Sequence, residues 1–144
     1  MEEKVDISEI ALNYFREGFS CSEATLRAAN DYYDMGLSSE TLKIATTFGA
    51  GFGGSKCSCG TVTGGEIVLG TLFGRTSSDQ SAKKAFETSK KLHDKFKKSF
   101  GHICCRILIK NYDWASSERK SYCEKFVAGG SEIIKSIIDE ENKK

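Results

Sequence analysis

The chain has 144 residues, a length typical of a single compact domain. Its 21 lysines and arginines nearly balance its 20 aspartates and glutamates, so the net charge of +1 provides no field that would attract nucleic acid or anionic lipid. The first residues are acidic where a secretory signal would be basic, and no apolar run approaches the roughly 18 residues that span a bilayer. We therefore expect a soluble cytoplasmic protein that binds neither nucleic acid nor membrane.

The sequence contains six cysteines. Because thiols in the cytoplasm are kept reduced, we expect these cysteines to be free, metal-bound or redox-active, and not to form a structural disulfide framework. A single cysteine most often packs as a small hydrophobic side chain, so a chemical role has to be argued from its position in the chain.

Glycines separate the predicted helices, since the chain has 14 glycines and no proline. Apolar residues recur at helical spacing over residues 7–16 and predict a first helix that ends at Gly18. Ser20 and Glu23 have the S-x-x-E spacing of a capping box, in which each side chain satisfies a free backbone donor at a helix start. This spacing predicts a second helix over residues 21–34.

The middle of the chain is rich in glycine. Apolar positions predict a third helix over residues 42–48, followed by a break at residues 49–54. The stretch TVTGGEIVLGTLFG, residues 61–74, contains four glycines, too many for an exposed helix that depends on propensity alone. We expect a central helix that its neighbours hold in place, with a short buried strand as the competing interpretation.

Three further elements follow in the last part of the chain. Residues 79–100 form the pattern of a long, lysine-rich amphipathic helix, which Gly101 can close. A short element, ICCRILI, precedes a last helix predicted over residues 118–140. No segment shows the alternation of a strand flanked by hairpin turns. The sequence therefore predicts an all-α, single-domain bundle of about five to six helices over residues 1–144, with a glycine-rich central helix.

Four of the cysteines fall near the starts of predicted helices. They are Cys21, in the first turn of the second helix, Cys59, at the start of the glycine-rich helix, Cys105, at the short element, and Cys123, in the second turn of the last helix. The free N–H groups and the dipole of a helix N-terminus stabilise an anion and lower a cysteine pKa. We therefore expect activated thiolates, above all at Cys59.

Four segments each contain one of these cysteines, in the order GFSCSEATL, CGTVTGG, FGHICCRILI and SYCEKFV. Together they resemble the C_GCAxxG_C_C family of redox-active proteins. The resemblance covers nearly the whole chain and places the family's cysteines at Cys21, Cys59, Cys105 and Cys123. Thr61 stands where the family pattern has alanine, and Cys57 and Cys104 lie outside the pattern. The resemblance implies a redox or cofactor-handling role and leaves the reaction open.

Thiol–disulfide or electron exchange is the preferred chemistry for these cysteines. Cys59 is then the candidate nucleophile. Its partner is either Cys57, through a strained C-x-C ring, or one of the other three family cysteines. A redox partner protein or a small thiol would supply or accept electrons, and whether the protein is itself an oxidoreductase stays open. We predict that at least two of the four family-matched sulfurs lie within about 7 Å of each other.

Metal binding is the alternative. The same four thiolates, Cys21, Cys59, Cys105 and Cys123, would hold zinc or an iron–sulfur cluster in a module that catalyses nothing by itself, with His102 as a further ligand. A third interpretation is a helical interaction domain whose cysteines serve only as small packing residues. Residues 49–54 match G-x-G-x-x-G but follow no strand, so we interpret them as a tight loop that brings backbone close to the thiols and shapes a small pocket.

Overall fold

The computed structural model describes residues 4–144, and the described chain is helical. Five helices of eleven or more residues form the bundle: α1 (Ile7–Glu17), α2 (Cys21–Tyr32), α5 (Gly60–Phe73), α6 (Lys83–Phe100) and α8 (Ser117–Asn142). Shorter elements lie between them: α3 (Ser39–Leu42), the 3-10 helix η1 (Lys43–Phe48), α4 (Gly49–Phe52) and α7 (Cys105–Leu108). The prediction of an all-α single-domain bundle is confirmed.

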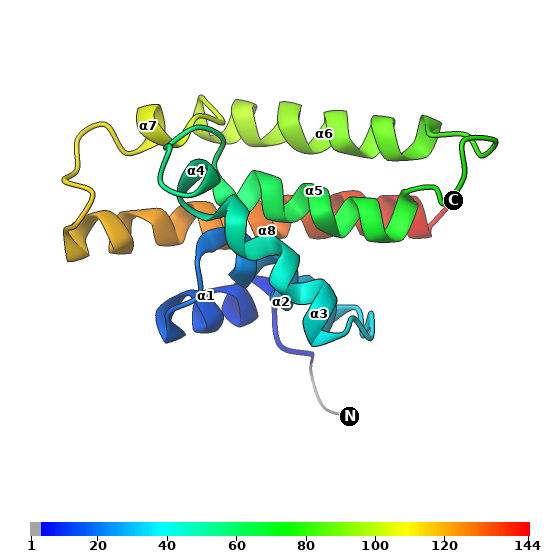
Figure 1. The fold of residues 1–144 in the computed structure, drawn as a ribbon, viewed down its shortest axis with the longest axis horizontal. Helices are drawn as coiled ribbons and strands as arrows, with labels where there is room; N and C mark the ends of the chain where they lie inside the picture. Colours follow the sequence, from blue (N-terminus) through cyan, green and yellow to red (C-terminus); the bar gives the residue numbers. More distant parts are fainter. Residues whose placement is uncertain (1–3) are drawn as a thin grey trace.

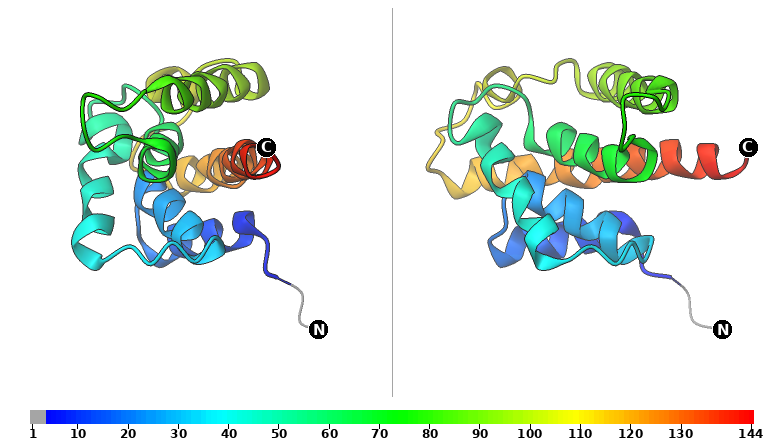
Figure 2. Two further views of the ribbon diagram at one scale, coloured as in Figure 1. Left: turned by 90° about the vertical axis from the view of Figure 1, so that its right-hand side faces the viewer. Right: turned by 45° about the vertical axis from the view of Figure 1, so that its right-hand side comes forward.

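The long helices are arranged in layers. α6 lies above α5 and α8, and α1 and α2 lie below them (Figure 1). Two further views show the same order, with α8 running along most of the length of the bundle (Figure 2). α4 and α7 lie together at the end of the bundle where α8 begins. Within residues 4–144, no helix has both the length and the apolar character needed to cross a bilayer.

The glycine-rich helix α5 is central, as predicted, and the alternative of a buried strand is wrong. α5 contacts α2, α6 and α8, and two of its glycines, Gly64 and Gly65, lie at the contacts with α2 and α8. A Cβ at Gly64 would lie 2.6 Å from the carbonyl oxygen of Ser22 on α2, and a Cβ at Gly65 would lie 2.6 Å from Cδ1 of Ile134 on α8. Close packing therefore stabilises a helix that its own propensity would not.

The capping box at the start of α2 is confirmed. The backbone N–H of Ser20 donates to Oε1 of Glu23 at 3.0 Å, and the N–H of Glu23 donates to Oγ of Ser20 at 3.4 Å. α2 ends at Tyr32, two residues before the predicted end, because Asp34 adopts a left-handed conformation with φ 51°. These local hydrogen bonds set the orientation in which Cys21 enters the helix.

The amphipathic helix α6 begins at Lys83 and not at residue 79 as predicted. The side chain of Gln80 accepts from the N–H of Thr76 at 2.8 Å, and the guanidinium of Arg75 donates to the carbonyl of Gln80 at 3.1 Å. These contacts hold the preceding loop in a non-helical conformation. α8 continues to Asn142, two residues beyond its predicted end.

The predicted glycine break at residues 49–54 contains a left-handed turn, α4. Five successive residues have positive φ, namely Ala50 (56°), Gly51 (64°), Phe52 (71°), Gly53 (65°) and Gly54 (93°). The N–H of Gly53 donates to the carbonyl of Gly49 at 2.8 Å and closes the turn. A left-handed conformation costs about 1–2 kcal/mol at a residue that has a Cβ, so Ala50 and Phe52 are strained. Packing at the neighbouring cysteine segments offsets this strain.

Candidate functional site

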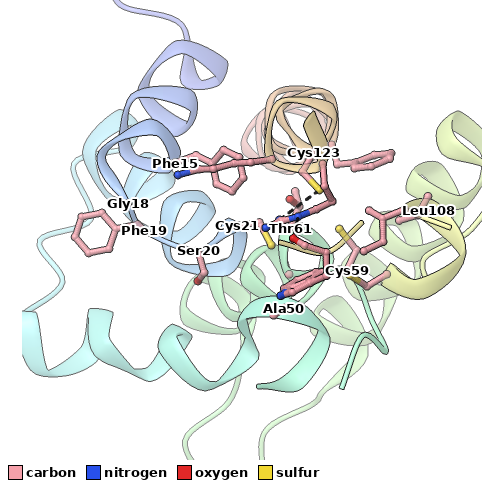
Figure 3. A pocket seen from close by; sticks show the side chains of 17 residues that line it. Phe15, Gly18, Phe19, Ser20, Cys21, Ala50, Cys59, Thr61, Leu108 and Cys123 are labelled. Carbon is pink, nitrogen blue, oxygen red and sulfur yellow. Dashed lines mark hydrogen bonds between the residues drawn. The ribbon is translucent and has the colours of Figure 1, made fainter. Parts of the chain in front are cut away.

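A cavity of about 230 Å³ lies at the end of the bundle where α2, α5, α7 and α8 begin (Figure 3). All four cysteines matched to the family motifs line it: Cys21, Cys59, Cys105 and Cys123. The rest of its wall is mainly apolar, with the side chains of Phe15, Phe19, Leu108, Ile109, Trp114 and Phe126. The structure thus brings together the four cysteines selected from the sequence.

A short antiparallel pairing joins two of the cysteine segments. Residues 56–59 run beside residues 103–106, and the N–H of Cys59 donates to the carbonyl of Ile103 at 2.7 Å. The N–H of Cys105 donates to the carbonyl of Cys57. This pairing fixes the starts of α5 and α7 next to each other, so Cys59 and Cys105 reach the same cavity although they are distant in the chain.

The two remaining cysteines lie outside the cavity wall. Cys104 stands opposite Ser58 in the antiparallel bridge, and its thiol lies 3.9 Å from the carbonyl oxygen of Lys56. Cys105, the first residue of α7, lines the cavity, whereas Cys104, which precedes the helix, is not a residue of the wall. Cys57 is exposed. Cys57 and Cys104 therefore provide matched controls for experiments on the cavity thiols.

The left-handed turn α4 contributes to the environment of Cys21. Ala50 lines the cavity, and its backbone N–H, together with those of Ser22 and Gly60, lowers the pKa of the Cys21 thiol. Burial acts in the opposite direction and is stronger, so the pKa of Cys21 lies above its ordinary value. The strained backbone at Ala50 thus directs a hydrogen-bond donor toward a sulfur.

Burial raises the pKa of all four cavity thiols. The pKa of Cys105 is raised to about 11, and that of Cys59 is raised further, because the side chain of Cys59 is only 6% exposed. The expectation that helix N-termini would lower these pKa values is wrong. A helix dipole stabilises a charge by about 0.3–1 kcal/mol, which is under one pKa unit, while burial can shift a pKa by about 3–5 units.

Arg119 is a residue of the cavity that the sequence interpretation missed. Its Nη1 lies 4.0 Å from the sulfur of Cys123, its Nε donates to the carbonyl of Trp114 at 3.0 Å, and its guanidinium lies 4.2 Å from the centre of the Trp114 ring. Its charge lowers the pKa of Cys123 and of Cys105 without outweighing burial. The signal was present, because residues four apart share a helix face and Arg119 precedes Cys123 by four.

The structure also bears on the proposed ligands of a metal. In the part of the chain that the structure describes, no three side chains of His, Cys, Asp or Glu are grouped closely enough to hold a metal ion. His102, the additional ligand considered above, is not a residue of the cavity wall. The described cysteines are free thiols.

Comparison with known proteins agrees with the resemblance noted in the sequence. Residues 19–137 match the model of a family described as "Putative redox-active protein (C_GCAxxG_C_C)". The search of curated proteins and the search of solved structures each found no match. The matched residues include all four cysteines of the cavity and make up more than half of the chain. This chain therefore belongs to the C_GCAxxG_C_C family.

Proposed function

We propose that this protein is a thiol-based redox protein in which Cys21, Cys59, Cys105 and Cys123 exchange between thiols and disulfides. The observation that supports the proposal is their convergence: four cysteines from four separate segments line one cavity. Cysteines that serve only as small packing residues would have no reason to collect on one wall. The redox description of the family points in the same direction.

Within this proposal, Cys123 is the attacking thiol, in place of Cys59 as expected from the sequence. Thiol–disulfide exchange needs a thiolate. Cys123 lies beside the positive charge of Arg119, whereas Cys59 has no such neighbour among the described residues and burial raises its pKa strongly. Cys105, which the same charge reaches, is the first candidate for the resolving thiol. Forming one disulfide then removes two electrons and two protons from two cavity thiols.

The location and the partner are part of the same proposal. We place the protein in the cytoplasm, where thiols are kept reduced and where protein disulfides are usually transient and catalytic. The electrons would pass to a disulfide on a partner protein or on a small molecule. We retain the prediction that at least two of the four sulfurs lie within about 7 Å, the reach that bridging requires.

The decisive experiment is titration of the reduced protein with diamide under anaerobic conditions. Free thiols are counted, and new disulfides are mapped by peptide mass spectrometry. We expect thiols to disappear in pairs, with every bridge between cavity cysteines. Cys57→Ser and Cys104→Ser should leave the mapped bridges unchanged, whereas Cys123→Ser should remove the first bridge that forms.

The same preparations distinguish the alternatives. A metal- or cluster-binding module would contain stoichiometric zinc or a brown iron–sulfide chromophore. The cavity Cys→Ser variants would lose this metal or chromophore, and Cys57→Ser would retain it. Cavity thiols that resist both diamide and alkylation until the protein is denatured would identify packing residues. Either result would overturn the redox proposal.

A further inference from the structure

Two cations line the cavity, and a third lies near one of its wall residues. Arg119 and Lys120 line its wall, and Nζ of Lys56 lies 5.2 Å from the centre of the ring of Trp114, another wall residue. Within residues 4–144, none of the three has a carboxylate partner within 4.0 Å. Their charges are therefore available to a ligand.

The wall contains no acidic side chain among the described residues. The carboxylate of Glu124, which lies one residue beyond Cys123, is bound to the guanidinium of Arg16 at 2.8 Å. Between apolar walls, charges interact more strongly than they do in water. A cavity of this kind attracts anions and repels cations.

The guanidinium of Arg119 is held in place. It stacks on the ring of Trp114 and donates through Nε to the carbonyl of the same residue, which fixes its charge beside the sulfur of Cys123. An arginine held in this way can bind a carboxylate with little further loss of side-chain entropy. The group that binds an anion and the thiol that attacks are therefore adjacent.

The sulfurs are recessed. The side chain of Cys59 is almost fully buried, and those of Cys21, Cys105 and Cys123 are half-buried behind a wall that includes Phe15, Phe19 and Trp114. A volume of about 230 Å³ has room for a small molecule. A small disulfide that enters the cavity can therefore reach these atoms.

We propose that the substrate of the cavity is a low-molecular-weight disulfide that carries carboxylates, with Arg119 binding a carboxylate while Cys123 attacks a sulfur. This inference rests on the proposed redox function and adds the substrate class. It follows from the unpaired cations at the wall, the lack of acidic wall residues and the recessed position of the thiols.

Two successive thiol–disulfide exchanges make up the proposed reaction. The thiolate of Cys123, after losing its proton to solvent, attacks one sulfur of the substrate R–S–S–R. A mixed disulfide between Cys123 and R–S forms, and the first R–S⁻ leaves and takes up a proton. A second cavity thiol, assigned to Cys105, loses its proton and attacks the sulfur of Cys123, which releases the second R–S⁻. Two electrons pass from the protein to the substrate, which leaves as two thiols.

Three small disulfides of similar size test the charge preference. Dithiodipropionate carries two carboxylates, bis(hydroxyethyl) disulfide is neutral, and cystamine carries two ammonium groups. The rate at which each forms the cavity disulfide is divided by its rate with free dithiothreitol, a neutral dithiol, which corrects for intrinsic reactivity. At low salt we expect a corrected rate for dithiodipropionate at least about tenfold above that for cystamine, and a smaller ratio at high salt.

Variants identify the source of the preference. Arg119→Gln should lower the ratio of anionic to cationic rates about tenfold, and Arg119→Lys should keep part of it, because the charge remains while the planar fork is lost. Lys125→Gln is the matched control, since it removes the same charge from the same helix at an exposed position outside the cavity wall. It should leave the ratio unchanged.

The outcomes separate this inference from the function on which it rests. If cystamine reacts as fast as dithiodipropionate after correction, or if Lys125→Gln and Arg119→Gln change the ratio equally, the substrate class is wrong while the redox function stands. If neither the small disulfides nor diamide produces a cavity disulfide, the redox function itself is wrong. Circular dichroism of each variant shows whether it has folded, and Arg119→Lys gives the answer if Arg119→Gln does not fold.

Discussion

The sulfur of Cys21 rests against the backbone of Gly60 in the first turn of α5. A Cβ built at Gly60 would lie 2.3 Å from Sγ of Cys21 and 3.0 Å from the backbone nitrogen of Ser22. The glycine therefore allows the starts of α2 and α5 to approach closely. Cys21 of α2 lies against Gly60, the residue that follows Cys59. Only a residue without a side chain fits between them.

Gly60→Ala should consequently destabilise the protein, although alanine is the better helix former. We expect the free energy of unfolding, measured with denaturant, to fall by about 1–3 kcal/mol, the usual cost of overpacking. Displacement of the sulfur should also make Cys21 react faster with alkylating reagents.

Gly70→Ala, in the same helix, is the control for this substitution. Among the described residues, a Cβ at Gly70 meets nothing within 4 Å. Only helix propensity changes, so the stability should rise by up to about 1 kcal/mol. Equal effects at Gly60 and Gly70 would show that the contact with Cys21 is not tight.

The left-handed turn α4 offers a second matched pair. Gly51 and Gly53 have nearly the same φ, 64° and 65°, so alanine is strained equally at both. A Cβ at Gly51 would lie 2.3 Å from the backbone nitrogen of Cys57, whereas one at Gly53 meets nothing within 4 Å. We expect Gly51→Ala to cost about 1–3 kcal/mol more than Gly53→Ala in thermal or denaturant unfolding. A smaller difference would mean that the turn is free to move away from the cysteine segment.

Thr61 lies in the first turn of α5, and its buried Oγ1 has no hydrogen-bond partner within residues 4–144. Thr61→Val keeps the shape of the side chain and removes the unpaired hydroxyl, so the free energy of unfolding should rise by about 1 kcal/mol. Thr25→Val is the comparison, because the hydroxyl of Thr25 donates to the carbonyl of Cys21 at 2.7 Å. Its loss should lower the stability by about 1 kcal/mol. Destabilisation of the same size in both variants would contradict the assignment of Thr61.

The raised pKa of Cys105 predicts an unusual pH dependence. In the folded protein, its alkylation by iodoacetamide should keep accelerating up to about pH 11, whereas in the unfolded chain the rate should level off above the ordinary cysteine pKa of about 8.5. Because folding raises this pKa, the protonated thiol favours the folded state. That contribution to stability is complete below the unfolded pKa and is lost as the pH rises toward about 11.

Peptide mass spectrometry measures the rate at Cys105 separately from the other thiols. The exposed thiol of Cys57, followed in the same samples, reports how the reagent itself responds to pH. A rate at Cys105 that levels off below pH 9 in the folded protein would contradict the burial of this thiol.

Much of the fold could be predicted from the sequence because it depends on local interactions. The capping box joins Ser20 to Glu23 within one turn, and the period of apolar residues sets which face of α6 is buried. The family motifs marked the cysteines of the cavity without any knowledge of distance. Errors occurred at helix ends, where loop contacts such as those of Gln80 compete with helix continuation.

The sequence by itself determined the helices, their order, and the selection of the four cysteines that line the cavity. The tertiary structure alone decided that residues 56–59 pair with residues 103–106, that Arg119 lies beside Cys123, and that burial raises the cysteine pKa values where helix starts alone would lower them. The physical reason is the separation along the chain of the residues that interact. Hydrogen bonds at a helix start involve neighbours in the chain, whereas the burial of a thiol depends on side chains that only folding brings to it.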